Sequence, residues 1–121
     1  MNLPPDLRGP FDALVVSPLV DVRELRGQVK AHYVQVSAEV AARGAVDAQR
    51  VADLASVVDA ALAAITRKTS PLHVRLMQAL ALWVLRPDVS HRASRERLDN
   101  DWRVAEEVVR VIRRPHILPR H

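Results

Sequence analysis

Apolar residues recur at intervals of three and four along most of this chain, which is the period of an amphipathic α-helix. The clearest segment lies between Ser70 and Pro87. Ser70 followed by Pro71 is typical of a helix start, because the Ser side chain can accept a backbone N–H and Pro loses only an N–H that would be unpaired. Pro87 disfavours helical geometry at the residue before it. The apolar positions between these signals share one helical face, and they are Leu72, Leu76, Leu80, Trp83 and Val84.

These signals predict a helix over about 71–86 that is apolar on nearly every side. Only Arg75 and Gln78 interrupt its apolar surface. A helix of this kind is buried either in protein or in lipid. Its length of about 24 Å falls short of the roughly 30 Å of hydrocarbon in a bilayer. We therefore expect a central core helix, with no membrane span.

The same period predicts three further helices, each with a Ser or Asp near its start. The first starts at Ser17 or Asp21 and the last at Ser94 or Asp99. The first of these helices is predicted over about 17–43, with Gly44 as its stop. The second is predicted over 47–68, capped by Asp47, and the third over 94–114, ending before Pro115. Short connections between helices favour a four-helix bundle or an irregular helical array around the central helix. The sequence therefore predicts an all-α fold.

The length of 121 residues suits one domain, with a helical part over 17–114. The proline-rich residues 1–16 are expected to be irregular, and residues 115–121 to form an extended tail. The chain has no Cys, which excludes a disulfide framework, a thiolate metal site and a cysteine nucleophile. The N-terminus lacks a basic start followed by an apolar core, so we expect no secretory signal and a cytoplasmic protein.

Charge is unevenly distributed along the chain. Residues 1–66 hold 6 Lys and Arg against 8 Asp and Glu, a net charge of −2, whereas residues 67–121 hold 12 against 6, a net charge of +6. A basic half can attract nucleic acid, an anionic membrane surface or an acidic protein, although Arg can also serve solubility alone. The candidate phosphate-binding residues are Arg92, Arg95, Arg97, Arg103, Arg110, Arg113 and Arg114. Aromatic stacking platforms are scarce, so any such contact would be electrostatic and insensitive to sequence.

One group of side chains has the chemistry of a metal site. Two or three carboxylates and an imidazole can hold a divalent ion or position a water, and the group consists of Asp88, His91, Asp99 and Asp101. Helix capping and the helix dipole account for the same Asp residues without a ligand. The five His residues show no i, i+4 pair, and there is no Gly-rich phosphate loop. We therefore predict no catalytic residue and no cofactor.

Protein interaction uses other residues. The first long helix has a broad apolar stripe, and both terminal segments carry apolar residues flanked by prolines, a pattern typical of segments that dock onto a neighbouring subunit. The candidates are Phe11, Leu14, His32, Tyr33, Ile117 and Leu118. The preferred hypothesis is a non-enzymatic interaction module, which could be a small subunit of a bacterial assembly or a homo-oligomer. A subunit that binds a nucleic-acid backbone is the alternative, and a metal-dependent enzyme using Asp88, Asp99 and Asp101 comes third.

Residues 68–112 also carry a series of short motifs in a fixed order. The series is Thr69-Ser70-Pro71, Val74–Met77, the apolar run Ala79–Leu85, Pro87-Asp88, the acidic Asp99–Asp101, and then Val104 and Val108. This order resembles the YkvA-like domain, a small bacterial helical domain whose biochemical role is unestablished. The chain departs from that family at Val89–Arg92, where the family has further apolar residues and a second Pro-Asp, and at Asn100, which splits the paired Asp. The resemblance implies a helical fold and brings no activity with it.

Overall fold

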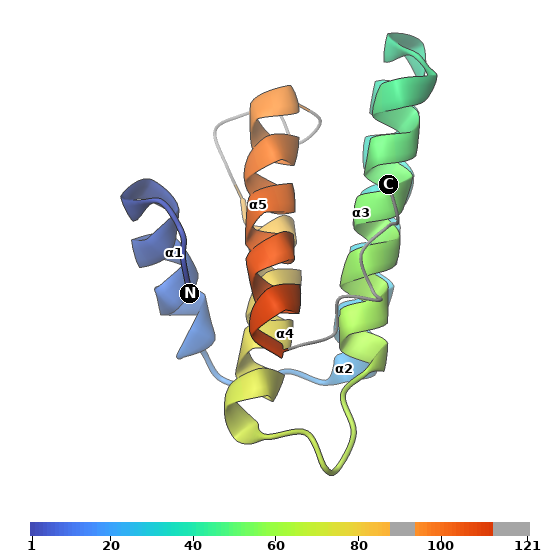
Figure 1. Cartoon of the computed structure of the whole chain (residues 1–121). Coiled ribbons are helices and arrows are strands. Elements are labelled where there is room, and N and C mark those ends of the chain that lie inside the picture. Colours follow the sequence, from blue (N-terminus) through green and yellow to red (C-terminus); the bar gives the residue numbers. More distant parts are fainter. Residues whose placement is uncertain (88–93, 113–121) are drawn as a thin grey trace.

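A computed structural model describes residues 1–87 and 94–112 of the chain (Figure 1). All regular secondary structure within these ranges is helical, which confirms the predicted all-α fold. The elements are α1 (Pro5–Val15), α2 (Val22–Val40), a 3-10 turn (Ala41–Arg43), α3 (Ala45–Ala63), α4 (Pro71–Leu85) and α5 (Arg95–Ile112).

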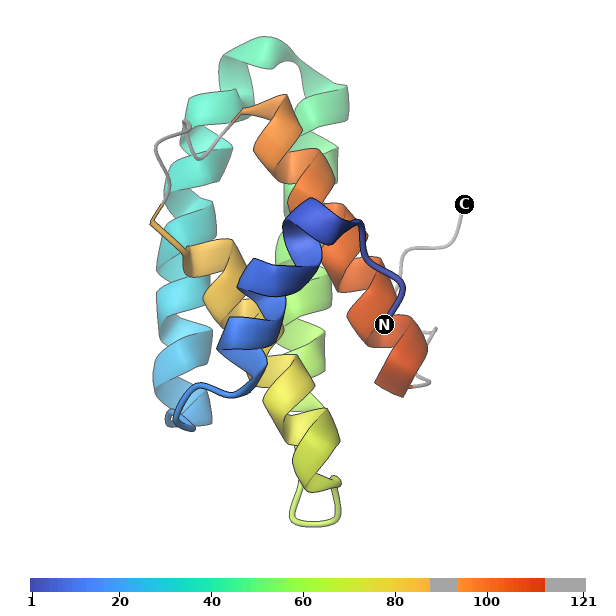
Figure 2. The ribbon, with the colours of Figure 1, turned by 90° about the vertical axis from the view of Figure 1, so that its left-hand side faces the viewer.

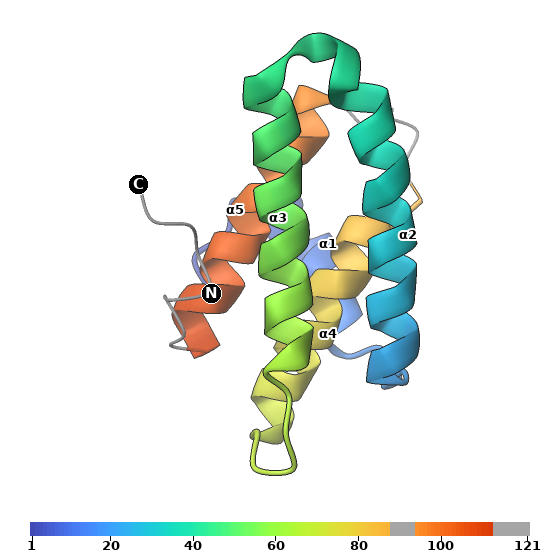
Figure 3. The same cartoon turned by 90° about the vertical axis from the view of Figure 1, so that its right-hand side faces the viewer.

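The helices lie in three layers. α2 and α3 form a long antiparallel hairpin on one side of the molecule, with α4 and α5 crossing behind it (Figure 3). α1 lies on the far side and packs against α4 (Figure 2). No helix in the described part of the chain has both the length and the hydropathy needed to cross a membrane.

α4 is the centre of the core, and it contacts all four other α-helices. Its start follows the predicted chemistry, since Ser70 Oγ accepts the backbone N–H of His73 at 3.3 Å and Pro71 opens the helix. Most of the helix from Leu76 to Val84 is buried. Leu72 is an exception because it lies in the exposed first turn and keeps 58 % of its surface.

The two polar residues of α4 hold the segment that links α1 to α2. The Gln78 side chain accepts the backbone N–H of Val20 at 3.0 Å and donates to the carbonyl of Val20 at 3.1 Å. Arg75 donates to the carbonyls of Val15 and Ser17 at 3.4 and 3.3 Å. These bonds satisfy polar groups that the core would otherwise leave without water.

The prediction that residues 1–16 are irregular was wrong. Pro5 is compatible with the first turn of a helix, where its missing N–H costs nothing. Pro10 lies inside α1 and weakens it, but Leu7 and Phe11 bury their side chains against the core, and the Phe11 ring meets the Trp83 ring edge-on at 6.2 Å. Tertiary packing therefore maintains a helix that Pro10 disfavours.

Of the starts predicted for the three other helices, two are confirmed and one is not. The Asp21 side chain caps α2, and Ser94 Oγ accepts the N–H of Arg97 at 3.2 Å at the start of α5. Asp47 does not cap α3. The helix begins two residues earlier, after Gly44, whose φ of +107° favours glycine, and Asp47 lies in the first turn.

Candidate interaction surface

Side chains of α2 and α3 line a groove between the two helices. Figure 3 shows this hairpin from the side opposite α4 and α5. The volume of the groove is about 760 Å³. Its lining consists mainly of apolar and small side chains with a few charged ones, namely Arg26, Gly27, Val29, Lys30, Tyr33, Val34, Ser37, Ala52, Ala55, Ser56 and Asp59. No other described helix fills it, so α2 and α3 present an uncovered apolar surface.

The groove is shaped by one projecting side chain among small ones. Val34 keeps 64 % of its surface exposed, whereas Val29 on the same helix is buried. Opposite it, α3 contributes Ala52 and Ala55, whose side chains end at Cβ. Gly27 lies in the same helix as Val34, and a Cβ placed there would meet nothing within 4 Å. Another helix could therefore approach this surface closely.

Charged groups lie toward one end of the groove. Arg26 donates to both carboxylate oxygens of Asp59 at 2.8 and 3.2 Å, which ties α2 to α3. The Asp59 carboxylate raises the pKa of Arg26, so the guanidinium stays charged. Lys30 follows one turn later on the same side of α2. Both signs of charge therefore border the same apolar surface.

Two smaller hollows share the Trp102 side chain on the other flank of α3. One, of about 580 Å³, lies between the start of α3 and α5, and its neighbour, of about 360 Å³, is lined mostly by polar groups. The Arg50–Asp99 ion pair connects α3 to α5 beside Trp102. The larger hollow is lined by apolar side chains, including the exposed Val46, together with charged ones such as Asp53. It has a smaller volume than the α2–α3 groove.

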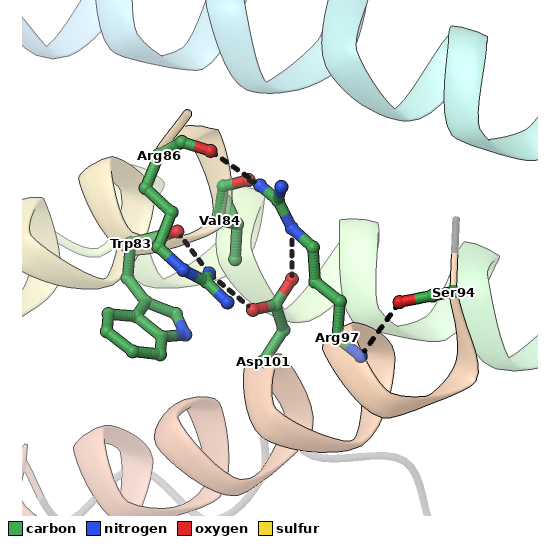
Figure 4. Close-up of polar contacts among 6 residues, drawn as sticks. All are labelled: Trp83, Val84, Arg86, Ser94, Arg97 and Asp101. Atoms are coloured by element: carbon green, nitrogen blue, oxygen red, sulfur yellow. Dashed lines mark hydrogen bonds and ion pairs between the residues drawn. The ribbon is translucent and has the colours of Figure 1, made fainter. Parts of the chain in front are cut away.

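A buried polar cluster joins the end of α4 to α5 (Figure 4). Arg86 donates to Asp101 Oδ1 at 2.8 Å and to the carbonyl of Trp83 at 2.6 Å, and its guanidinium lies 3.9 Å from the centre of the Trp83 ring. Arg97 donates to the carbonyls of Val84 and Arg86 at 3.0 and 2.8 Å. These bonds cap the last carbonyls of α4, which is a structural role.

Burial dominates the protonation of this cluster. Only 2 % of the Asp101 side chain is exposed, and this burial raises the pKa of Asp101 to about 6, although the positive charges of Arg86 and Arg97 oppose the shift. Burial also raises the pKa of Tyr33 well above its ordinary value, and the Asp101 charge adds to this effect. Tyr33 also lines the α2–α3 groove.

The structure divides the predicted phosphate-binding arginines. Arg97 is only 4 % exposed and donates to backbone carbonyls, so its inclusion was wrong. Arg95 pairs with Asp47 at 3.2 Å and Arg110 with Glu107 at 2.8 Å, both at the surface. Arg103 is exposed on α5. The others, Arg92, Arg113 and Arg114, lie outside the described residues.

The predicted metal ligands do not converge where the structure describes them. Asp99 is exposed and pairs with Arg50, whereas Asp101 points into the core toward Arg86. The other two candidates, Asp88 and His91, lie outside the described residues. Across residues 1–87 and 94–112, no three His, Asp or Glu side chains are close enough to share a metal ion.

The predicted interaction residues are mostly occupied within the chain. Phe11 is fully buried, so the prediction that it contacts a partner was wrong. Tyr33 is 4 % exposed and lines the α2–α3 groove. Leu14 and His32 are half-buried, and the His32 ring meets the Tyr33 ring edge-on at 4.9 Å. The remaining two, Ile117 and Leu118, lie outside the described residues.

Of the residues that line the groove, Tyr33 alone was among those predictions. Comparison of the chain with protein-family models, curated protein sequences and solved structures finds no match. The resemblance of residues 68–112 to the YkvA-like domain therefore stays a prediction.

Proposed function

We propose that this protein is a helical interaction module that binds another polypeptide along the α2–α3 groove. The observation that carries the proposal is the exposed apolar surface around Val34, which no other described helix covers. Apolar surface left in water is unfavourable, and its burial against a partner is the main favourable term in protein association.

The shape of the groove supports a helical partner. Small side chains at Ala52, Ala55 and Ser56 lower the surface of α3, so a helix can lie close to it. Helices pack at about 8–10 Å when the contacting side chains allow it. The charged groups at one end would fix the direction in which the partner lies.

The basic residues of α5 give weaker support to nucleic-acid binding. Arg97 is buried, and the exposed Arg95 and Arg110 are each paired with a carboxylate. A phosphate backbone would have to displace those carboxylates. A polypeptide that buries Val34 requires no such exchange.

Site-specific photocrosslinking tests this proposal. A photoreactive amino acid replaces Val34 in the full chain, expressed in its native host, and the matched control carries it at Ala13, an exposed position on α1. We expect position 34 to capture protein, its own copy included, far more strongly than position 13. Capture of nucleic acid, or equal yields at the two positions, would overturn the proposal.

A further inference from the structure

Gly27 is the first indication of which polypeptide lies in the groove. It is placed inside α2, where glycine is unfavourable because the unfolded chain has more freedom to lose. Among the described residues nothing requires it, since a Cβ at Gly27 would meet none of their atoms within 4 Å. Gly9 also has open space, but it precedes Pro10, whose ring restricts the residue before it. The missing side chain at Gly27 is explained if another backbone approaches it from outside.

We infer that a second copy of this chain occupies the groove, with α2 of each copy packed on α3 of the other around a two-fold axis along the groove. The inference rests on the proposed function and names its partner. Such an axis produces a four-helix arrangement in which α2 and α3 alternate and all neighbours are antiparallel.

The charges of the groove complement one another under this symmetry. Arg26 and Asp59 lie at the same level of the hairpin, because they form an ion pair across it. Rotation about an axis along the groove leaves the height of each residue along the helices unchanged. Arg26 and Lys30 of one copy therefore lie beside Asp59 of the other. A partner with a single sign of charge would meet repulsion from one of these groups.

The apolar groups match at the next level. Val34 lies about two turns beyond Arg26, and Ala52 lies about two turns before Asp59 on the antiparallel helix. Each Val34 therefore projects against the small Ala52 of the other copy. This is the fit of a projecting side chain into a low surface that close helix packing needs.

The size of the surface is sufficient. α2 and α3 have 19 residues each. Each helix is about 28 Å long and about 10 Å wide, so the two side by side give a face of about 560 Å² per copy. The total of about 1,100 Å² is close to the lower limit for specific interfaces. We therefore expect a dimer that forms reversibly with concentration.

Light scattering of the purified full chain tests the dimer. We expect the mass to rise with concentration from 13.5 kDa toward twice that value and to persist in high salt. Gly27→Leu and Val34→Asp should each keep the mass at 13.5 kDa with an unchanged helical spectrum. Leu is a better helix former than Gly, and space is open at position 27, so Gly27→Leu does not lose the dimer by unfolding. Ala13→Asp should leave the dimer intact.

Disulfide trapping tests the arrangement, because the chain contains no cysteine of its own. Mixing Val34→Cys chains with Ala52→Cys chains under mild oxidation should give a covalent dimer, whereas mixing Val34→Cys with Ala13→Cys should not. A monomer at every concentration would overturn the dimer while leaving protein capture at position 34 to stand or fall separately. A dimer that survives Gly27→Leu and Val34→Asp, or one that links 34 to 13 as readily as to 52, would overturn this interface.

Discussion

The Arg86–Asp101–Arg97 cluster and the α2–α3 groove both place side chains against their usual preference. The cluster buries charged groups, and the groove exposes an apolar side chain together with a helical glycine. In the cluster the reason lies within the chain, because the arginines bond the last carbonyls of α4 and Asp101 bonds Arg86. In the groove no described residue supplies a reason. A buried charge that is bonded within the chain indicates a role in stability. An exposed apolar group that no described contact explains indicates a partner.

The largest expected effect of a substitution is at the cluster. Asp101→Ala removes the buried carboxylate beside Arg86 and should lower the free energy of unfolding by about 3–5 kcal/mol in urea titrations at neutral pH. The control is Asp99→Ala, which breaks an exposed pair with Arg50 and should cost about 0–1 kcal/mol. Equal effects would remove the distinction between the buried and the exposed carboxylate.

The pH dependence of stability should also report on the cluster. The pKa of Asp101 is about 6 in the folded protein against an ordinary 3.8, so between these values the folded state binds more protons than the unfolded state. The contribution of Asp101 to the free energy of unfolding therefore falls by about 3 kcal/mol as pH rises from about 4 to about 6. Asp101→Asn should abolish this fall. An Asp101 carboxyl signal that titrates below pH 4 in NMR would contradict the expectation.

A smaller effect of opposite sign is expected in the groove. Gly27→Ala should raise the free energy of unfolding by about 0.5–1 kcal/mol in dilute protein, because alanine favours the helix and its Cβ has open space. Denaturant titration at low concentration, where copies are apart, measures it. If Gly27→Ala destabilises dilute protein, the single chain needs the glycine. The contrast between the groove and the buried cluster would then not hold.

The smallest effect is expected at Val34. Val34→Ser should change the stability of dilute protein by no more than about 0.5 kcal/mol, since most of the side chain is already in water. Thermal unfolding at low concentration checks this. A loss comparable to that of a core valine would show that Val34 supports the fold, which would sharpen the boundary between core and surface in α2.

The sequence predicted the fold better than the surface. The central helix was predicted closely because its Ser-Pro start, apolar run and Pro stop are local signals. α1 was missed because its stability comes from burying Leu7 and Phe11, and this outweighs the cost of Pro10 inside the helix.

The site was less accessible to sequence reasoning, for two different physical reasons. Arg97 was assigned to the surface by its charge, although Arg97, Asp101, Val104 and Val108 follow one another at helical spacing and so share one buried face. That signal was present in the sequence. The groove depends on which faces of α2 and α3 lie next to each other, and the pattern of one helix does not specify that pairing. The glycine inside the first long helix was the one signal of it in the sequence.

The bonds between Gln78 and Val20 have a consequence for hydrogen exchange. The Val20 amide belongs to no helix, and its N–H is held by a side chain of the central core. Its deuterium exchange should therefore be slow, at the rate of amides that open only when α4 itself separates from its neighbours. A single amide signal in an irregular segment would thus serve as a spectroscopic reporter on the integrity of the whole interior.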